Sequence, residues 1–172
     1  MLVQASPFAV LPPLLPRRSV TVTVTFMPPV NVQFAVGAHV LAVLAHHGQT
    51  AVTSELIARS INADPSFVRR SMARLGRAGL VETSRGANGA SALARASEDI
   101  TLLDVYAASG QGPVLQVHSY PIVPSCPVSP YIKPALGHPV AVAQSEFEKT
   151  LDRYSIAALL GDIQRRRSRS GS

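Results

Sequence analysis

Hydrophobic positions recur at helical spacing in the middle of the chain. Residues 31–47 (NVQFAVGAHVLAVLAHH) are apolar on nearly every side and are followed by Gly48, as is typical of a buried helix and its C-terminus. Residues 53–61 continue the helical pattern over a shorter length, and Thr53 or Ser54 stands where a helix takes its N-cap. The pattern therefore predicts two helices, of which the first is buried.

A third helix is indicated by the residues at its two ends. Asp64 is a favourable N-cap, and Pro65 follows at the first helical position, where the missing N–H costs nothing. The helical pattern continues to about Ala78 and stops at Gly79. Because only residues 62–63 separate this helix from the second, the three segments predict a helix-turn-helix.

The third helix has two contrasting faces. At 100° per residue its apolar residues fall within about 60° of one another, and three arginines fall within about 60° on the opposite side. The apolar set is Val68, Met72, Leu75 and Gly79, and the arginines are Arg70, Arg74 and Arg77. On an isolated helix such a stripe is usually a solvated face. As the second helix of a helix-turn-helix, however, this element is the one that enters the major groove of DNA.

After the third helix the pattern changes to period two. Residues 80–84 (LVETS) and 91–94 (SALA) are predicted strands, and residues 85–90 (RGANGA) form the turn between them. A two-stranded ribbon after a helix-turn-helix is a wing. Its glycines let the backbone approach a phosphate or a minor groove closely, and Arg85 and Arg95 supply positive charge. An ordinary hairpin with incidental arginines is the alternative.

Helical spacing returns in the last third of the chain. Thr101 is placed to cap a short helix that ends near Gly110, and the proline-rich residues 111–130 are predicted to be a loop. Helix is expected again at 131–136 and then over 139–153. This last segment and the residue after it carry a packed apolar stripe, made of Val140, Ala143, Phe147, Leu151 and Tyr154.

The two ends of the chain differ from the middle. Residues 1–30 combine a Pro-rich piece with the alternating run VTVTVTF, and we treat them as an N-terminal extension that is disordered or not native. Met27 stands just before the first clear helix and is an alternative start of the functional chain. Ser155 can cap a last short helix to Ile163, and residues 164–172 (QRRRSRSGS) are expected to form a disordered basic tail.

Positive charge is concentrated in the middle of the chain. The formal net charge is +6. Residues 31–97 contain seven arginines and three acidic residues, a balance of +4, whereas residues 98–163 contain three basic and seven acidic residues, a balance of −4. The middle of the chain is therefore the part suited to a polyanion such as double-stranded DNA.

Other classes of protein find little support in the sequence. The lone Cys126 excludes an intramolecular disulfide framework and fits a reducing compartment, so we expect a cytoplasmic protein. Every long apolar run is interrupted by a charge, a proline or a polar residue, so we expect no membrane partner. We find no nucleophile elbow, phosphate loop or recognisable carboxylate pair, and we expect no enzyme. The histidines have no metal-ligand spacing, so no metal site is expected either; they are His39, His46, His47, His118 and His138.

Three blocks of sequence carry a family resemblance. Residues 34–45 read FAVGAHVLAVLA, residues 53–86 read TSELIARSINADPSFVRRSMARLGRAGLVETSRG, and residues 93–106 read LARASEDITLLDVY. These blocks resemble the Rrf2 family of bacterial winged-helix transcription regulators. The resemblance implies a homodimer in which the helix 139–153 crosses its twin, so that two recognition helices reach a palindromic operator.

The chain departs from the family in two places. The family's wing usually reads R-G-P-x-G-G, whereas here Ala87 replaces the proline and Ala90 replaces one glycine. Iron–sulfur members carry three cysteines in the loop before the long helix, and this chain has only Cys126, which cannot hold a cluster that needs four ligands. We therefore expect the cluster-free branch and no cofactor. Cys126 is then either a redox sensor or a small apolar filler under the dimer helix.

Together these patterns predict a mainly α fold with a small β-wing: a winged helix-turn-helix domain at 31–97, and a linker with a long dimerisation helix at 98–163. We expect a sequence-specific regulator, a repressor, that binds a palindromic operator as a homodimer. A winged-helix protein-interaction module without specific DNA binding is the alternative. The inducer cannot be read from the sequence.

Roles within the predicted DNA-binding surface follow from position. Residues at the start of the recognition helix would lie nearest the base edges, and these are Ser66, Phe67, Arg69 and Arg70. The remaining arginines would hold phosphates, together with a wing residue; this group is Arg74, Arg77, Arg85, Arg95 and Asn88. The apolar stripe on the long helix would form the dimer interface.

Overall fold

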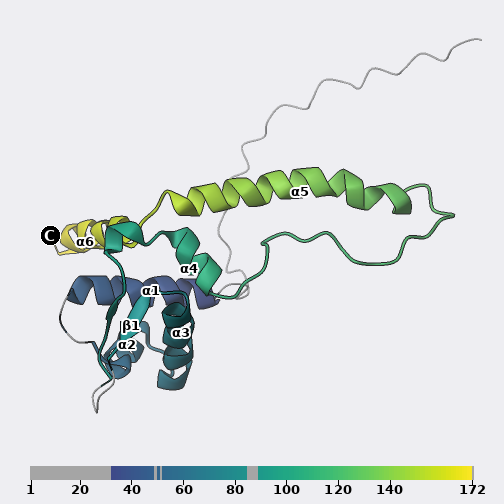
Figure 1. Ribbon diagram of the computed structural model, residues 1–172. Coiled ribbons are helices and arrows are strands. Elements are labelled where there is room, and N and C mark those ends of the chain that lie inside the picture. Colours follow the sequence, from purple (N-terminus) through teal and green to yellow (C-terminus); the bar gives the residue numbers. More distant parts are fainter. Residues whose placement is uncertain (1–31, 49, 51, 85–88, 172) are drawn as a thin grey trace, which may run out of the picture. The chain divides into compact units, whose positions relative to one another are not determined.

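The computed structural model describes residues 32–48, 50, 52–84 and 89–171 (Figure 1). The predictions for residues 1–30, for Arg85 and for Asn88 lie outside the described residues. The elements are, in chain order, α1 (Val32–His47), α2 (Ser54–Ile61), α3 (Pro65–Arg77), β1 (Val81–Thr83), β2 (Ser91–Leu93), a 3-10 helix η1 (Ser97–Asp99), α4 (Leu102–Ala108), α5 (Ser129–Asp152) and α6 (Ile156–Ser170). The predicted fold class, mainly α with a small β-wing, is confirmed.

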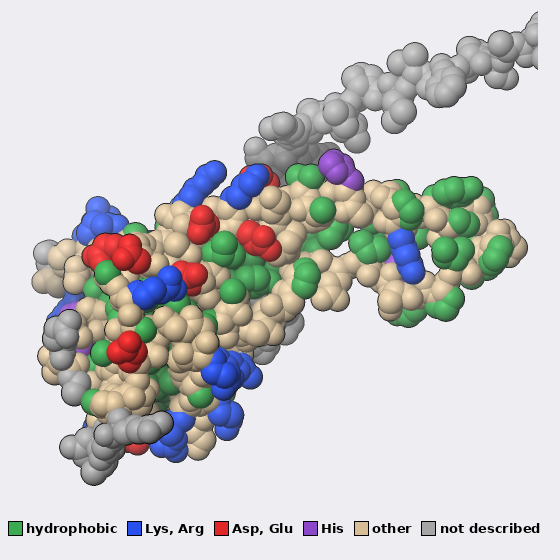
Figure 2. Space-filling model, viewed as in Figure 1, with side chains coloured by type: hydrophobic (Ala, Val, Ile, Leu, Met, Phe, Trp, Pro, Cys, Tyr) green, Lys and Arg blue, Asp and Glu red, His purple; other side chains and the backbone are tan. Residues whose placement is uncertain are grey.

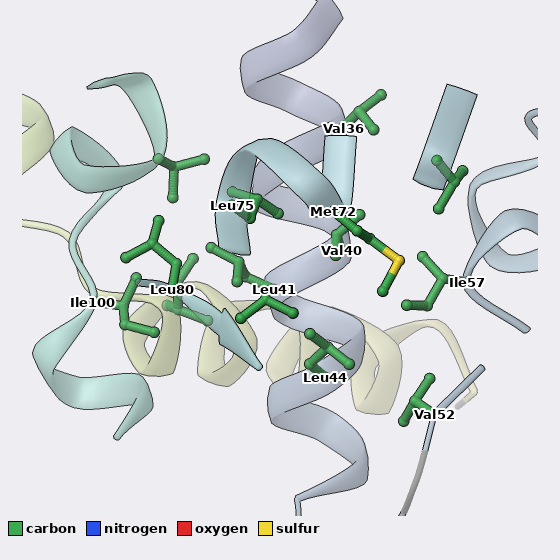
Figure 3. Packing of buried hydrophobic residues seen from close by; sticks show 14 of the residues in the cluster. Val36, Val40, Leu41, Leu44, Val52, Ile57, Met72, Leu75, Leu80 and Ile100 are labelled. Atoms are coloured by element: carbon green, nitrogen blue, oxygen red, sulfur yellow. The ribbon is translucent and has the colours of Figure 1, made fainter. Parts of the chain in front are cut away.

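Helix α1 lies at the centre of the core. Val40, Leu41 and Leu44 are almost completely buried, and α1 contacts α2, α3, β2, α4 and α6. Figure 3 shows buried side chains from the other elements, among them Ile57, Leu75 and Ile100, gathered around it. A helix that is apolar over most of its surface must be covered over most of it, which explains why the other elements pack around this one and leave only Ala35, His39 and His46 exposed beyond its first residue.

Local hydrogen bonds determine the geometry of the helix-turn-helix. The Thr53 hydroxyl accepts from the Leu56 N–H at 3.3 Å, so Thr53 is the N-cap of α2 as predicted. The helix ends at Asn62, which has a positive φ of 55° and whose N–H donates to the carbonyls of Ala58 and Arg59. Asparagine tolerates this left-handed conformation, and it turns the chain directly into α3.

The wing is a two-stranded antiparallel sheet with the register Val81↔Leu93, Glu82↔Ala92 and Thr83↔Ser91. The Ser91 N–H donates to the Val52 carbonyl at 2.9 Å, which ties the wing to the segment that precedes α2. The predicted strands are therefore confirmed, each slightly shorter than expected.

The start of α4 is joined to the start of α6. Thr101 and Asp104 form a reciprocal capping box at the N-terminus of α4, in which the Thr101 hydroxyl accepts from the Asp104 N–H at 3.2 Å. The Ile156 N–H donates to the Ile100 carbonyl at 2.8 Å. Because Ile100 and Ile156 are both fully buried, this junction attaches α6 to the core.

Helix α5 is continuous, whereas the sequence predicted two helical pieces separated before Pro139. Both Pro134 and Pro139 lie inside the 24-residue helix. Each proline removes one backbone hydrogen bond, and on a helix without buried side chains water can reach the carbonyl that is left. Among the described helices, α5 included, none combines the length and the apolar character that crossing a membrane requires.

Helix α6 extends further than the sequence predicted. Residues 164–170 were expected to belong to a disordered tail, but they are helical. The Asp162 carboxylate accepts from Arg166 Nε at 2.6 Å and from an Arg165 Nη at 3.3 Å, and the bond from Arg166 in particular lowers the pKa of Asp162. Ion pairs at these spacings favour a helix, as do the propensities of Gln and Arg, and the low-complexity composition concealed this.

Candidate nucleic-acid interface

Helix α3 presents one face to the core and the other to solvent. Val68, Met72 and Leu75 are buried as predicted. Gly79, the fourth residue of the predicted apolar set, is exposed because it lies beyond the end of α3 at Arg77. On the opposite side Arg70 and Arg77 are exposed, and Arg74 is half-buried. Figure 2 shows Lys and Arg side chains along the part of the surface where α3 lies. The core therefore holds α3 so that its arginines face outward.

Asp64 holds the first turn of α3 in place. Its Oδ1 accepts from the Ser66 N–H at 2.8 Å and from the Phe67 N–H at 3.1 Å. The Phe67 N–H first, and then the Ser66 N–H, lower the pKa of the Asp64 carboxyl group. This cap therefore defines the position of Ser66 and Phe67, which the sequence placed nearest to base edges.

Phe67 differs from an ordinary exposed contact residue. Its ring is half-buried against the hydrophobic core, and the Arg70 guanidinium carbon lies 6.0 Å from the ring centroid. A cation at this distance from an aromatic face is attracted to it. The Phe67 ring therefore helps to position the Arg70 guanidinium, and it lies next to Arg70 on the proposed DNA-binding surface.

Arg69 bridges the two helices of the helix-turn-helix. One Nη lies 3.5 Å from Glu55 Oε1 on α2, and the other lies 3.5 Å from the Ser66 hydroxyl oxygen. The Arg69 and Glu55 side chains are 56% and 60% exposed, and pairs so exposed contribute little stability, so Arg69 can exchange this partner for another anion. Sequence reasoning missed Glu55, because the pair is fourteen positions apart and meets only when α2 packs on α3.

Arg95 has a partner that the sequence did not indicate. One Nη lies 3.2 Å from Asp104 Oδ2, and the same oxygen accepts from the Thr101 N–H at 3.0 Å. Arg95 therefore reinforces the start of α4 in the free protein. Its side chain is still 42% exposed, which leaves part of the guanidinium accessible.

Cys126 lies just before the N-terminus of α5. The side chain is half-exposed. The N–H of Val128, and then that of Ser129, lower the pKa of the thiol below its ordinary value. The sequence did not indicate this effect, since backbone amides become donors to the sulfur only through the geometry of the helix start.

The apolar residues predicted to form the dimer interface differ in how far they are covered by their own chain. The Phe147 ring packs edge-on against Tyr106 of α4 at 5.1 Å between centroids, so this residue is occupied within its own chain. Val140 and Leu151 are half-buried, whereas Ala143 and Tyr154 are exposed. Only part of the stripe is thus free for a second copy.

Comparison with protein families identifies residues 30–162 with the Rrf2 model, described as an iron-dependent transcriptional regulator. Two Bacillus subtilis (strain 168) proteins named as HTH-type transcriptional regulators are similar in sequence. YwnA is 33% identical over 135 residues, which cover 78% of this chain and 98% of YwnA. YwgB is 39% identical over 69 residues, which cover 40% of this chain and 44% of YwgB. These similarities confirm a regulator and not an enzyme.

Solved structures show the same fold. A crystal structure described as that of a DNA-binding protein matches with a TM-score of 0.60 at 30% identity, covering 74% of this chain and 98% of that one. CymR of B. subtilis, described as the global cysteine regulator, matches with a TM-score of 0.60 at 20% identity, covering 78% of this chain and 98% of CymR. T. potens IscR matches with a TM-score of 0.57 at 24% identity, covering 78% of this chain and 87% of IscR.

The iron in the family's description does not fit the donors of this chain. Cys126 is its single cysteine. Over the described ranges, no three His, Cys, Asp or Glu side chains lie together as a metal site would require. An iron–sulfur cluster takes four ligands, mostly thiolates, and this chain offers one thiolate. The donors of this chain therefore do not fit an iron–sulfur cluster.

The cap on α3 leads to a pH-dependent prediction. Asp64→Ala should lower the melting temperature at neutral pH, whereas Asp64→Asn should lower it less, because asparagine is also a good N-cap. A carboxyl group whose pKa is lowered by folding stabilises the protein above its ordinary value of 3.8, and this contribution disappears as the pH falls through the folded-state pKa. The wild-type advantage over Asp64→Asn should therefore shrink on acidification, as measured by thermal unfolding followed by circular dichroism.

Equal melting temperatures of wild type and Asp64→Ala at neutral pH would show that the cap does not stabilise the recognition helix. An advantage over Asp64→Asn that is independent of pH would show that the charge of Asp64 plays no part.

Proposed function

The chain belongs to the Rrf2 family of transcriptional regulators, and from this premise we propose that it binds a palindromic operator as a homodimer and represses transcription. The observation that carries the proposal is the outward arginine face of α3, on a helix whose opposite face is buried in the core. In a helix-turn-helix this is the geometry that brings side chains to the edges of bases in the major groove.

Contacts with DNA divide into two groups in this proposal. Base edges would be contacted from the first turns of α3, by Ser66, Phe67, Arg69 and Arg70. Arginine commonly pairs with guanine through two parallel hydrogen bonds. Phosphates would be held further along α3 and on the wing, by Arg74, Arg77, Arg85, Asn88 and Arg95. Glu55 and Asp104 would keep Arg69 and Arg95 ordered before DNA arrives.

A winged-helix module that binds only protein is the alternative function. Such a module gains nothing from an arginine face, because desolvating several like charges at an interface is unfavourable unless acidic groups face them. The exposure of Arg70 and Arg77 therefore favours DNA. We propose repression rather than activation, because a dimer bound to its operator can block RNA polymerase without making any further contact.

The homodimer is supported by the exposure of α5. None of its 24 residues is buried within the single chain. Large apolar side chains on or next to this helix are exposed, namely Val128, Tyr131, Leu136, Val142 and Tyr154. Exposed apolar side chains along a helix of this length are typical of an interface, and a twofold axis through the helix would place two copies of α3 on the two halves of a palindrome.

Cys126 is the proposed point of redox control. Its lowered pKa raises the thiolate fraction, and its half-exposed position gives an oxidant access. A change at Cys126 would act at the start of α5, and so on the element proposed to set the distance between the two recognition helices.

The roles of the arginines can be tested with the DNA upstream of the protein's own gene. Arg70→Ala should cost about 1–3 kcal/mol for the preferred base and relax the sequence preference. Arg85→Ala should weaken binding to all sequences alike and reduce the steepness of the salt dependence. Fluorescence anisotropy at two salt concentrations, against operator and competitor DNA, measures both effects.

Uniform weakening by both substitutions would contradict the division of roles. If even the wild type binds every DNA weakly and loses that binding as salt rises, then only nonspecific charge is present, and the protein-interaction module becomes the better proposal.

The dimer can be tested by one substitution at two positions on α5. Ala143→Glu places a charge on the predicted interface stripe and should shift the protein toward monomer, because an unpaired charge at an interface is costly. Ala141→Glu is the matched control: Ala141 is also exposed, and it lies about 160° around the helix from Ala143. Sedimentation velocity measures the mass. Equal behaviour of the two variants would place the interface elsewhere.

Redox control by Cys126 can be tested with peroxide. Oxidation by hydrogen peroxide should weaken operator binding by the wild type, a thiol reductant should restore it, and Cys126→Ser should bind DNA regardless of oxidant. Anisotropy on the same operator supplies the measurement. Loss of binding by oxidised Cys126→Ser would assign the effect to another residue, and an unaffected wild type would leave Cys126 as a packing residue.

A further inference from the structure

A cleft of about 400 Å³ lies between α1, α2 and α6, and none of the residues proposed to contact DNA lines it. Helix α6 lies beside α1 here, and its C-terminal extension, which the sequence analysis had assigned to a disordered tail, supplies Gln164 and Arg167 to the wall (Figure 1). The volume falls within the range in which proteins bind small organic ligands.

Most of the cleft is apolar. Val43 of α1, Leu56 of α2 and Leu160 and Ile163 of α6 contribute to its walls. Leu56 is 36% exposed and Ile163 is 45% exposed, so within the single chain these side chains are only partly covered. A ligand with an apolar body would remove this surface from water, which is favourable in proportion to its area.

The polar groups of the cleft favour an anion. Arg167, His46 and His47 line it, and no carboxylate does. Arg165 and Arg166 on the same helix are paired with Asp162, whereas within the described part of the chain Arg167 forms no ion pair. A guanidinium beside an apolar wall is well suited to hold one carboxylate, and the imidazoles can donate further hydrogen bonds.

We propose that this cleft binds a small carboxylic acid with an apolar body, with the carboxylate at Arg167 and the apolar part against Leu56, Leu160 and Ile163. A metal ion does not suit the cleft, because no three metal-ligating side chains are grouped in the described residues. The excess of apolar over polar lining likewise disfavours a strongly hydrated anion such as phosphate.

Helix α2 links this cleft to the DNA-binding surface. Leu56 and Ser60 face the cleft, and the Ser60 hydroxyl lies 3.2 Å from His39 Nε2 on α1. Glu55, the residue before Leu56, pairs with Arg69 of α3. Helix α2 packs on both α1 and α3. A ligand that changes how α2 packs on α1 would therefore change how α3 is presented, so the acid is an effector of DNA binding. This last step rests on the proposed function, whereas binding of the acid does not.

The cleft is tested with octanoate as the probe and the full chain as the protein. Isothermal titration calorimetry should show saturable binding of one octanoate per chain, and 1-octanol, which lacks the charge, should bind much more weakly. Arg167→Gln should weaken octanoate binding about tenfold or more, because it removes a charged hydrogen-bond donor. Arg169→Gln is the matched control, since it makes the same change on the same helix outside the cleft lining.

Three results would overturn the proposal. If octanoate does not bind, the cleft does not take an apolar acid, and a second copy of the chain seated in it would give this result. Equal binding of 1-octanol, or equal weakening by Arg167→Gln and Arg169→Gln, would remove the specific role of Arg167.

The link to DNA is tested separately. Operator affinity measured by anisotropy should change several-fold with saturating octanoate in the wild type, and it should not change at the same concentration in Arg167→Gln. Octanoate binding without an effect on a functional operator complex would refute the effector role alone. Absence of any operator complex would refute the proposed function, and the calorimetry would still decide the binding site.

Discussion

The other elements of the structure are arranged so that most of the apolar surface of α1 is buried. Val40, Leu41 and Leu44 are shielded from solvent only because α2, α3, β2, α4 and α6 all pack against this one helix. Gly37 shows how close this packing is, since a Cβ at this position would lie 3.1 Å from Val105 Cγ1 of α4. The positions of the other elements therefore follow from their close packing against helix α1.

The same packing orders the surface proposed for DNA. Because Val68, Met72 and Leu75 point into the core, the arginines on the other side of α3 must face solvent. Glu55 and Asp104 pair with Arg69 and Arg95 through weak, exposed contacts. Helix α2 takes part twice, because it carries Glu55 toward α3 and Leu56 toward the cleft beside α6. A small displacement of α2 therefore reaches both surfaces.

Helix α5 stands outside this arrangement. It is the longest helix, yet it has no buried residue and contains two prolines in its interior. Phe147 anchors it to Tyr106, while Ala143 and Tyr154 remain exposed. A helix with these properties gains little stability from its own chain, which is the physical reason to expect that a partner covers it.

The fold class and most of the local structure could be predicted from the sequence. Thr53, Asp64 and Thr101 were identified as caps because capping depends on neighbours within a few residues, and the inward face of α3 was identified because helical periodicity is local. The sequence was less reliable where local signals compete, as at Pro139 and in residues 164–170, where exposure and ion pairs outweigh proline content and low complexity. Other features became visible only in the folded chain, namely the pairs Arg69–Glu55 and Arg95–Asp104, the contact of Phe147 with Tyr106, and the cleft that Arg167 lines. Each of these joins residues from different elements, and their distances are defined only after the elements have packed around α1.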